Sequence, residues 1–118
     1  MVVRKCSAPD SFWASVEDFF GWTQEEFTSK RKQEPLATAR AALTAYMYYG
    51  LSMDCISIGR ILNRDRTNAY HHIQSHEDRM QYTLDQNGTR RFVDINYYDT
   101  YSALEAYMDP ERQLKLAV

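Results

Sequence analysis

Hydrophobic residues recur at the helical spacing of three or four positions along most of this chain. The first such segment predicts an amphipathic helix over residues 11–20, with Asp10 or Ser11 as its cap. Gly21 is placed to end it. The apolar face of this helix consists of Phe12, Trp13, Val16, Phe19 and Phe20.

Two further helices are expected before residue 50. Thr23 and Glu26 have the spacing of a capping box, which predicts a short helix through Phe27. An Ala-rich helix is expected from about residue 36 to 49, and Gly50 is placed to stop it. Its predicted buried face consists of Ala39, Leu43, Tyr46 and Met47.

Residues 53–72 predict two helices joined by a tight turn. The first is expected over residues 53–62, capped by Ser52, with Gly59 where two helices could cross. Its inward positions are Cys55, Ile58, Ile61 and Leu62. Asn63 interrupts the pattern, and Asp65 can cap a second helix. This arrangement is a helix-turn-helix unit.

The second helix of this unit opens with three polar residues, Arg66, Thr67 and Asn68, and is expected to continue through Met80 toward Leu84. The following Asn87-Gly88 pair has two interpretations. It either stops that helix or forms the turn of a hairpin between residues 82–85 and 91–95. We favour the helix stop, because a lone hairpin is marginally stable.

The C-terminal part is expected to hold a helix over residues 100–108, with Ser102 and Glu105 at capping-box spacing. Asp109-Pro110 would then start a last turn or short helix. The predicted fold class is therefore all-α, a helix-turn-helix bundle of about five to seven helices, with a small hairpin around residues 82–95 as the alternative.

The composition of the chain is typical of a folded globular domain without a membrane-spanning helix. With 118 residues and 44% hydrophobic content, the chain is expected to form one domain with a real core. No apolar run approaches the ~18 residues of a membrane helix, and the N-terminus lacks a signal-peptide pattern, so we expect a cytoplasmic, nucleoid-associated protein. Cys6 and Cys55 have no zinc-site spacing and are expected to stay reduced.

The sequence contains few features that are typical of a catalytic site or a metal site. It contains no catalytic triad, paired-carboxylate site or phosphate-cradling loop, so we expect neither an enzyme nor a cofactor. His72 and His76 are four positions apart with Glu77 adjacent, but no further ligand completes a metal site. One aromatic cluster is expected to be mainly core, with stacking on single-stranded bases as the alternative. It consists of Trp13, Phe19, Phe20, Trp22 and the tyrosines from Tyr46 to Tyr49.

The charge is unevenly distributed, although the net charge is only −2. Residues 29–72 contain seven Lys or Arg residues and three Asp or Glu residues, whereas the remainder of the chain is acidic. A local excess of positive charge can attract phosphate while the acidic remainder limits non-specific adhesion. The alternative is a chance cluster of solvated charges.

Five stretches occur in a fixed order: VEDFF (16–20), SKRK (29–32), ATARAALTAYM (37–47), SIGRIL (57–62) and RDRTNAYHH (64–72). Together they resemble the C-terminal DNA-binding domain (domain IV) of the bacterial replication initiator DnaA, a Trp-repressor-like helical fold. The resemblance covers about residues 14–82 of a single domain and leaves residues 83–118 as an extension. It implies a standalone DNA-binding module, encoded for example by a phage, plasmid or other mobile element.

The chain departs from the family pattern in three ways. Only Asn63 stands where the family usually has two glycines, so the turn is one residue shorter. Arg66 replaces the family's His, and Asn68 replaces its second Thr, which implies a different recognition sequence. The sequence has no GxxxxGK[ST] loop, so the ATPase module of full-length initiators is missing.

The resemblance implies that the opening turn of the second helix reads bases. Arg66 suits guanine, Asn68 suits adenine, and Thr67 suits a thymine methyl group or a phosphate. Asp65 is expected mainly to cap the helix, with contact to a cytosine amine or orientation of Arg66 as alternatives. His71 is expected to pack internally or to touch a backbone phosphate.

A second contact is implied at the basic loop before Pro35. In the family an Arg of this loop reaches the minor groove, and Lys32 occupies its place here, beside Arg31. The remaining cations are expected to contact backbone phosphates. They are Lys30, Arg40, Arg60 and Arg64.

The predicted function is sequence-specific binding of double-stranded DNA, in replication-origin binding or in transcriptional regulation. Because a single domain binds DNA weakly, a homodimer or recruitment by a partner is expected. The alternative is an interaction module that docks on a replication or regulatory protein, suggested by the acidic charge outside residues 29–72 and the tyrosines of the tail. These tyrosines are Tyr97, Tyr98, Tyr101 and Tyr107.

Overall fold

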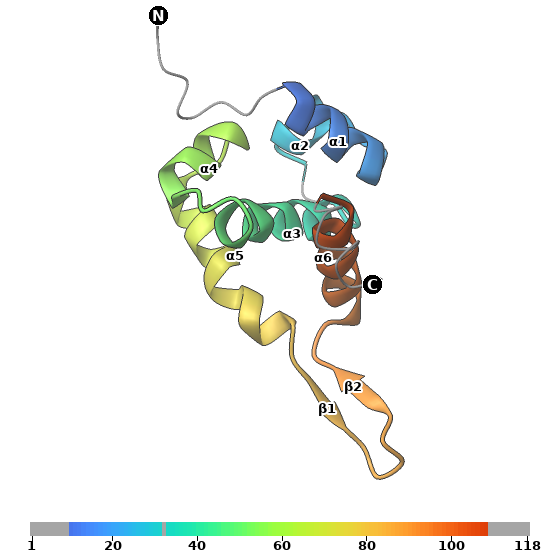
Figure 1. Ribbon diagram of the computed structural model, residues 1–118. Helices are drawn as coiled ribbons and strands as arrows, with labels where there is room; N and C mark the ends of the chain where they lie inside the picture. The colour runs from blue at the N-terminus through green and yellow to red at the C-terminus, as the bar shows by residue number, and fades with distance from the viewer. Residues whose placement is uncertain (1–9, 32, 109–118) are drawn as a thin grey trace, which may run out of the picture.

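The computed structural model describes residues 10–31 and 33–108 of the chain. Within them it contains six helices and one antiparallel hairpin, so the predicted all-α class with a small hairpin is confirmed (Figure 1). In chain order the elements are α1 (Asp10–Phe20), α2 (Gln24–Thr28), α3 (Leu36–Tyr49), α4 (Cys55–Ile61), α5 (Arg66–Arg79), β1 (Tyr82–Leu84), β2 (Arg90–Phe92) and α6 (Ile95–Met108).

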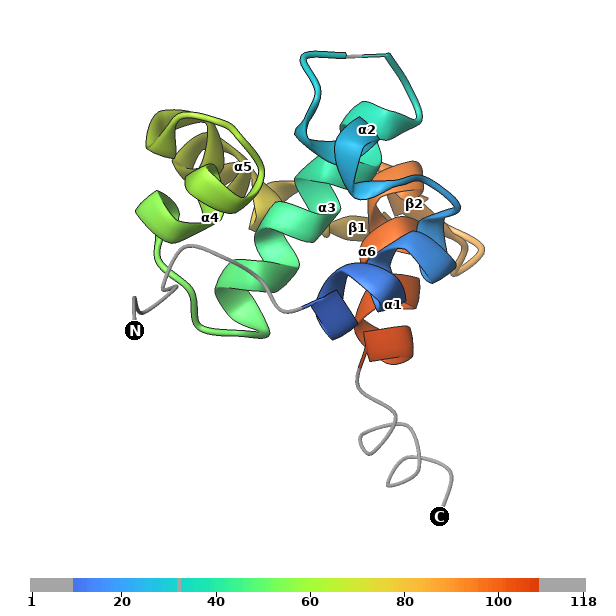
Figure 2. The ribbon, with the colours of Figure 1, turned by 90° about the horizontal axis from the view of Figure 1, so that it is seen from above.

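Helix α3 is the centre of the fold. It lies between the α4–α5 pair on one side and α1 with α6 on the other (Figure 2). A helix that is covered on several sides needs small residues where its neighbours approach. Four buried alanines of α3 meet this need, and they are Ala39, Ala41, Ala42 and Ala45.

The first three helices follow their predictions closely. The capping box is formed, because the Thr23 side chain accepts from the Glu26 backbone N–H at 3.2 Å and the Glu26 carboxylate accepts from the Thr23 N–H at 3.0 Å. Gly21 adopts φ +80 after α1, a conformation that glycine reaches without steric cost. These local signals were sufficient because each is made within a few residues of the helix end.

Two helix starts were predicted at the wrong residue. Helix α4 begins at Cys55, where Asp54 accepts from the Ser57 N–H at 2.7 Å; Ser52 does not cap it and instead adopts φ +56. Helix α6 begins at Ile95 rather than near residue 100, and Asp94 accepts from the Tyr97 N–H at 3.1 Å. In both cases an aspartate close to the predicted start provides the cap.

The preference for a helix stop at Asn87-Gly88 was wrong, and the hairpin alternative is the one formed. Helix α5 ends at Arg79, and Leu84 pairs with Arg90 across the hairpin. The Asp85 carboxylate accepts from the Asn87 and Thr89 N–H groups, each at 2.9 Å, which fixes the turn.

This hairpin is not isolated. The ring of Phe92 lies 4.7 Å from that of Tyr98 on α6 and 5.3 Å from that of Tyr82, measured between ring centroids. The aromatic contact attaches the hairpin to the helical body and supplies the third element that a two-stranded ribbon requires. The turn predicted at Asp109-Pro110 lies outside the described residues.

The expectation that the aromatic residues are core is correct only for some of them. Trp13 and Tyr46 are buried, whereas Phe19, Phe20 and Trp22 are partly buried and Tyr48 and Tyr49 are exposed. No helix in the described part of the chain has the length and apolar character needed to cross a lipid bilayer.

Candidate nucleic-acid interface

The turn between α4 and α5 is held by a close backbone contact. The Arg64 N–H donates to the Gly59 carbonyl at 2.6 Å, and Asn63 adopts φ +56, a left-handed conformation that Asn tolerates better than most residues. A Cβ atom on Gly59 would lie 2.6 Å from the Arg64 carbonyl oxygen. The predicted close crossing at Gly59 is therefore confirmed.

The first turn of α5 presents its polar residues as expected, with one correction. Arg66 and Thr67 are exposed, and Asn68 is half-buried. Asp65 occupies the N-cap position, but its side chain makes no capping hydrogen bond, so the predicted capping role of its carboxylate is wrong. The Asp65 carboxylate is exposed on the same end of the helix as Arg66.

The exposed face of α5 extends beyond the residues that sequence analysis selected. Tyr70 is 52% exposed, and its hydroxyl accepts from the Gln74 side-chain amide at 2.7 Å. With Thr67 and His71, these residues follow the helical spacing opposite the buried Ala69. That spacing could have identified Tyr70 and Gln74 as members of the presented surface.

The two neighbouring histidines of α5 have different environments. His71 is exposed, whereas His72 is half-buried. Burial, together with the positive charge of Arg79, lowers the pKa of His72 to about 4. His72 is therefore neutral near pH 7, and among these two residues only His71 lies on the solvent-facing side.

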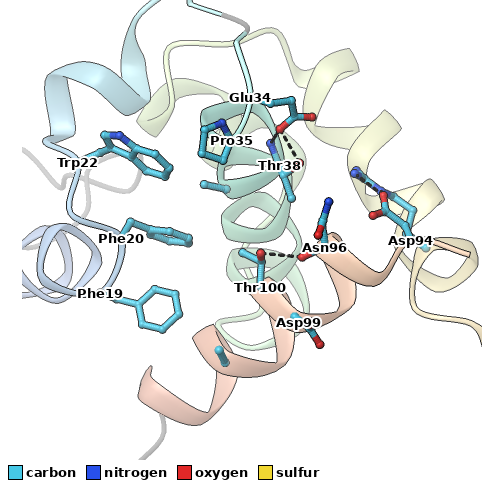
Figure 3. Close-up of a pocket in the computed structure, with 13 residues that line it drawn as sticks. Phe19, Phe20, Trp22, Glu34, Pro35, Thr38, Asp94, Asn96, Asp99 and Thr100 are labelled. Carbon is cyan, nitrogen blue, oxygen red and sulfur yellow. Dashed lines mark hydrogen bonds and ion pairs between the residues drawn. The ribbon is translucent and has the colours of Figure 1, made fainter. Parts of the chain in front are cut away.

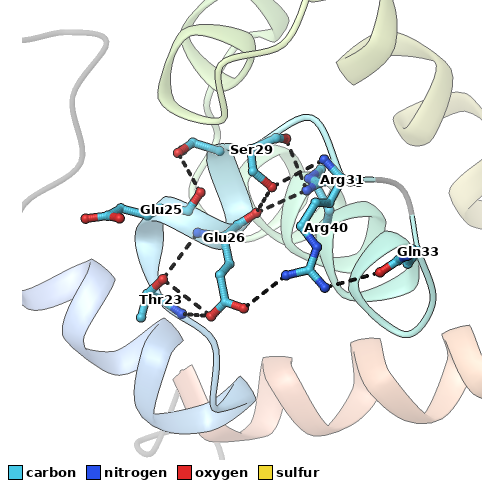
Figure 4. A network of polar contacts seen from close by, with 8 residues as sticks. Thr23, Glu25, Glu26, Ser29, Arg31, Gln33 and Arg40 are labelled. Atoms are coloured by element: carbon cyan, nitrogen blue, oxygen red, sulfur yellow. Dashed lines mark hydrogen bonds and ion pairs between the residues drawn. The ribbon is translucent and has the colours of Figure 1, made fainter.

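The expectation that Arg40 contacts phosphate is not met. Arg40 is 4% exposed, and its guanidinium is surrounded by main-chain oxygens of α2 and the basic loop (residues 29–35), as Figure 4 shows. The Nε atom donates to Phe27 O at 2.9 Å, and Nη1 donates to Arg31 O at 2.8 Å. The Nη2 atom donates to Glu26 O and Ser29 O at 3.3 and 3.4 Å.

Arg40 therefore shapes the basic loop from the inside. Burial and the nearby charge of Arg64 lower the pKa of Arg40 to about 10, so the guanidinium is still protonated at neutral pH. The planar guanidinium can donate in several directions at once, which suits a loop whose carbonyls converge on one point.

A second arginine fastens the helix-turn-helix to this loop. The Arg64 guanidinium is half-buried, donates from Nη2 to Ser29 O, and donates from Nη1 to Asn63 O at 3.1 Å. The Asn63 side-chain amide donates to Thr28 O at 3.2 Å. The turn is thus connected to the loop at Ser29 and to the end of α2 at Thr28. The predicted phosphate contact of Arg64 stays a prediction.

A hollow of about 690 Å³ lies between the basic loop and the helix-turn-helix, next to these connections. Its lining comes from both parts of the chain and consists of Lys30, Gly59, Arg60, Asn63, Arg64, Asp65 and Asn68. Three of these seven residues are cationic, and one is acidic. The structure thus unites residues that the sequence placed in two separate contacts.

The remaining loop cations differ in their surroundings. Lys30 and Arg31 are both exposed. Arg31 lies 3.5 Å from a Glu26 carboxylate oxygen and donates to Gln33 at 3.2 Å (Figure 4). An exposed pair of this kind contributes little to stability, so the guanidinium can exchange Glu26 for a phosphate at small cost. Lys32, the predicted minor-groove residue, lies outside the described residues.

Comparisons with protein-family models, curated proteins and solved structures found no match for this chain.

Proposed function

We propose that this chain binds double-stranded DNA sequence-specifically, with α5 in the major groove and the basic loop against the backbone and minor groove. The observation that carries the proposal is the connection from Arg64 and Asn63 to Ser29 and Thr28. It holds two cationic contact points in one body, so that both can engage a duplex without an ordering cost at binding.

Each contact has a separate role in this proposal. Arg66 is exposed at the start of α5 and pairs with a guanine, and a good bidentate pair is worth roughly 1–3 kcal/mol of discrimination. Lys30 and Arg60, which line the hollow, contact and neutralise phosphates of the DNA backbone. Asn68, half-buried in the same hollow, pairs with an adenine in this proposal.

The resemblance to DnaA domain IV supports the same proposal, since the spaced motifs and the loop-to-turn connection would both serve an initiator-like grip. The proposed cellular role is binding at a replication origin or at an operator. Double-stranded DNA is the proposed partner, and the proposed location is the nucleoid. A second copy of the chain, or a recruiting protein, would raise the affinity of a single domain.

Selection of bound duplexes from a random library, followed by fluorescence anisotropy, tests the proposal. We expect one enriched sequence class, with Arg66→Ala relaxing the preference at a single guanine position. Lys30→Ala should weaken all sequences alike and reduce the salt slope by about 0.9. Arg90→Ala, an exposed arginine on the hairpin, is the matched control and should change neither quantity.

The proposal fails if no sequence class is enriched, or if Arg66→Ala and Arg90→Ala behave alike. Equal salt slopes for the unmodified chain and the Lys30→Ala variant would remove the loop from the interface.

A further inference from the structure

A second pocket lies beside the start of α3, and Arg79 at the end of α5 is part of its lining. It has a volume of about 700 Å³ and is bounded by the end of α1, the start of α3 and the first half of α6. Figure 3 shows a column of three aromatic rings on one side, facing polar side chains of α3 and α6. None of the residues proposed to contact DNA lines this pocket.

The aromatic wall consists of Phe19, Phe20 and Trp22, which remain only partly buried. Phe19 and Phe20 meet edge to face, with ring centroids 4.8 Å apart. Phe20 and Trp22 are stacked at 6.1 Å with an interplanar angle of 21°. The rings are therefore fixed by one another, and their remaining surface is available to a ligand without rearrangement.

The opposite wall carries an excess of negative charge. Asp94 is neutralised by Arg79, whose Nη2 atom lies 3.0 Å from it. Glu34 accepts from the Thr38 backbone and hydroxyl through one oxygen, at 3.0 and 2.6 Å, but has no cationic partner among the described residues. Asp99 is exposed and likewise has no cation beside it in the described part of the chain.

This combination selects a positively charged group. A guanidinium or ammonium gains from the negative face of an aromatic ring and from a carboxylate at the same time. Nucleic acid is disfavoured, because Glu34 and Asp99 repel phosphate. The volume lies within the usual range of roughly 300–1,000 Å³ for ligand pockets, which is enough for a cationic side chain with an apolar neighbour.

We propose that this pocket docks a basic peptide segment of a partner protein. A Lys or Arg side chain of the segment lies against the aromatic wall, in the pocket that Glu34 and Asp99 also line, and an adjacent apolar side chain covers Trp22. The charge complementarity of the two uncompensated carboxylates identifies this occupant. None of the residues proposed to contact DNA lines this pocket, although Glu34 belongs to the basic loop. The existence of the pocket does not depend on DNA binding.

Selection from a random displayed-peptide library against the immobilised chain tests this inference. We expect the enriched peptides to place an aromatic or large aliphatic residue within about three positions of Lys or Arg. A synthetic peptide with the enriched sequence should bind the Glu34→Gln, Asp99→Asn double variant about tenfold more weakly than the unmodified chain. Both substitutions keep the shape of the side chain, and the amide oxygen introduced by Glu34→Gln can still accept from Thr38.

The matched control removes two carboxylates elsewhere, in the Glu25→Gln, Asp78→Asn variant, whose sites are exposed and outside this pocket. It should retain the affinity of the unmodified chain. Amide chemical shifts should change at Thr38 and Thr100 on peptide binding, and those at Arg66 should stay constant.

Three results would overturn the inference. They are enrichment of peptides without cations, equal weakening by both double variants, and shift changes confined to α4 and α5. Concentration-dependent dimerisation that the Glu34→Gln, Asp99→Asn variant abolishes would assign the pocket to a second copy of the chain instead. Duplex binding measured on the same variants separates this outcome from failure of the DNA proposal.

Discussion

The guanidinium of Arg64, in the turn between α4 and α5, donates a hydrogen bond to the main-chain oxygen of Ser29, 35 residues earlier in the chain. This contact makes the position of the basic loop depend on the helix-turn-helix. A loop that is fixed in this way presents its cations at a constant distance from α5.

Replacing Arg64 by Met should release the basic loop while leaving the helices intact. We expect the amides of Lys30 and Arg31 to exchange hydrogen at least about tenfold faster, because the loop loses the side-chain bond from Arg64 to Ser29 that joins it to the turn. Asn63→Gly should have a smaller effect in the same direction, since it removes the bond to Thr28 and keeps a residue that adopts the left-handed backbone conformation. Hydrogen exchange read by NMR measures both, and unchanged loop protection in Arg64→Met would contradict the prediction.

Arg40→Ala should destabilise the whole domain. The substitution removes four hydrogen bonds, and a cost of about 2–4 kcal/mol in the free energy of unfolding is expected. Phe27 O and Arg31 O lose the donor that they have in the structure, whereas Ser29 O keeps the Arg64 guanidinium. Arg40→Lys should recover little of this, because one ammonium cannot reach carbonyls on both sides of the loop. Urea unfolding followed by circular dichroism provides the measurement.

The contrasting control for Arg40 is Arg31→Ala, which removes an exposed side chain from the same loop. Its unfolding free energy should stay within about 0.5 kcal/mol of the unmodified chain. Similar losses for both arginines would contradict the structural role of Arg40.

Gly59→Ala should loosen the turn between α4 and α5. The added Cβ meets backbone rather than a flexible side chain, 2.6 Å from Arg64 O, so the helices must separate, at about 1–3 kcal/mol. Ile56→Ala on the same helix removes a side chain that is 48% exposed and should cost much less. Thermal unfolding of the two variants tests the difference, and a stable Gly59→Ala variant would show that the turn can adapt.

Stability should fall on acidification within a defined window. The pKa of His72 is lowered to about 4 by burial, whereas an unfolded His titrates near 6.5. Between these values the unfolded chain binds more protons than the folded chain, so the free energy of unfolding decreases as the pH falls from about 6.5 to about 4. Above this window the contribution of His72 is constant.

The comparison of His72→Gln with the unmodified chain isolates this effect, because the variant no longer titrates at position 72. Urea unfolding at a series of pH values should give a shallower pH dependence for the variant. Gln74→Ala, on the same helix, should keep the original slope. A parallel pH dependence in all three proteins would refute the assignment.

Asp94 should contribute to stability in two ways, as the cap of α6 and as the ion-pair partner of Arg79. Asp94→Ala removes the cap of α6 and the pair of hydrogen bonds from Arg79, at 3.0 and 3.1 Å, and should cost about 1–3 kcal/mol. Asp94→Asn keeps an acceptor for the Tyr97 N–H and should cost less. Chemical unfolding ranks the two, and equal losses would mean that the charge alone matters.

The hairpin is a segment in which tertiary contacts, and not the local hydrophobic pattern, determine the structure. Asn87-Gly88 suits either a helix stop or a turn, and the local sequence does not separate the two. The contact of Phe92 with Tyr98 decides the choice, because it gives the two strands a helix to pack against. Tyr98 itself lies on a helix whose start was predicted about five residues too late.

The site shows the same division. Arg66 and Thr67 could be selected from sequence because polar residues in the first turn of a helix face solvent by geometry. Arg40 was misassigned because a buried arginine and a surface arginine have the same sequence signature. Only the carbonyls of residues 26–31, gathered by the fold, show that its guanidinium is used internally.

The sequence by itself determined the helices with strong local signals, the helix-turn-helix around residues 53–72 and the clustering of basic residues in segments 29–32 and 60–66. These features follow from the spacing of hydrophobic residues, from helix caps and from the positions of basic residues, all of which can be recognised within a few residues of sequence. The tertiary structure decided that Arg64 connects the turn to the loop, that Arg40 is internal, and that Phe19, Phe20 and Trp22 line one pocket with Glu34 and Asp99. Such relationships depend on contacts between distant segments, and no local pattern records them.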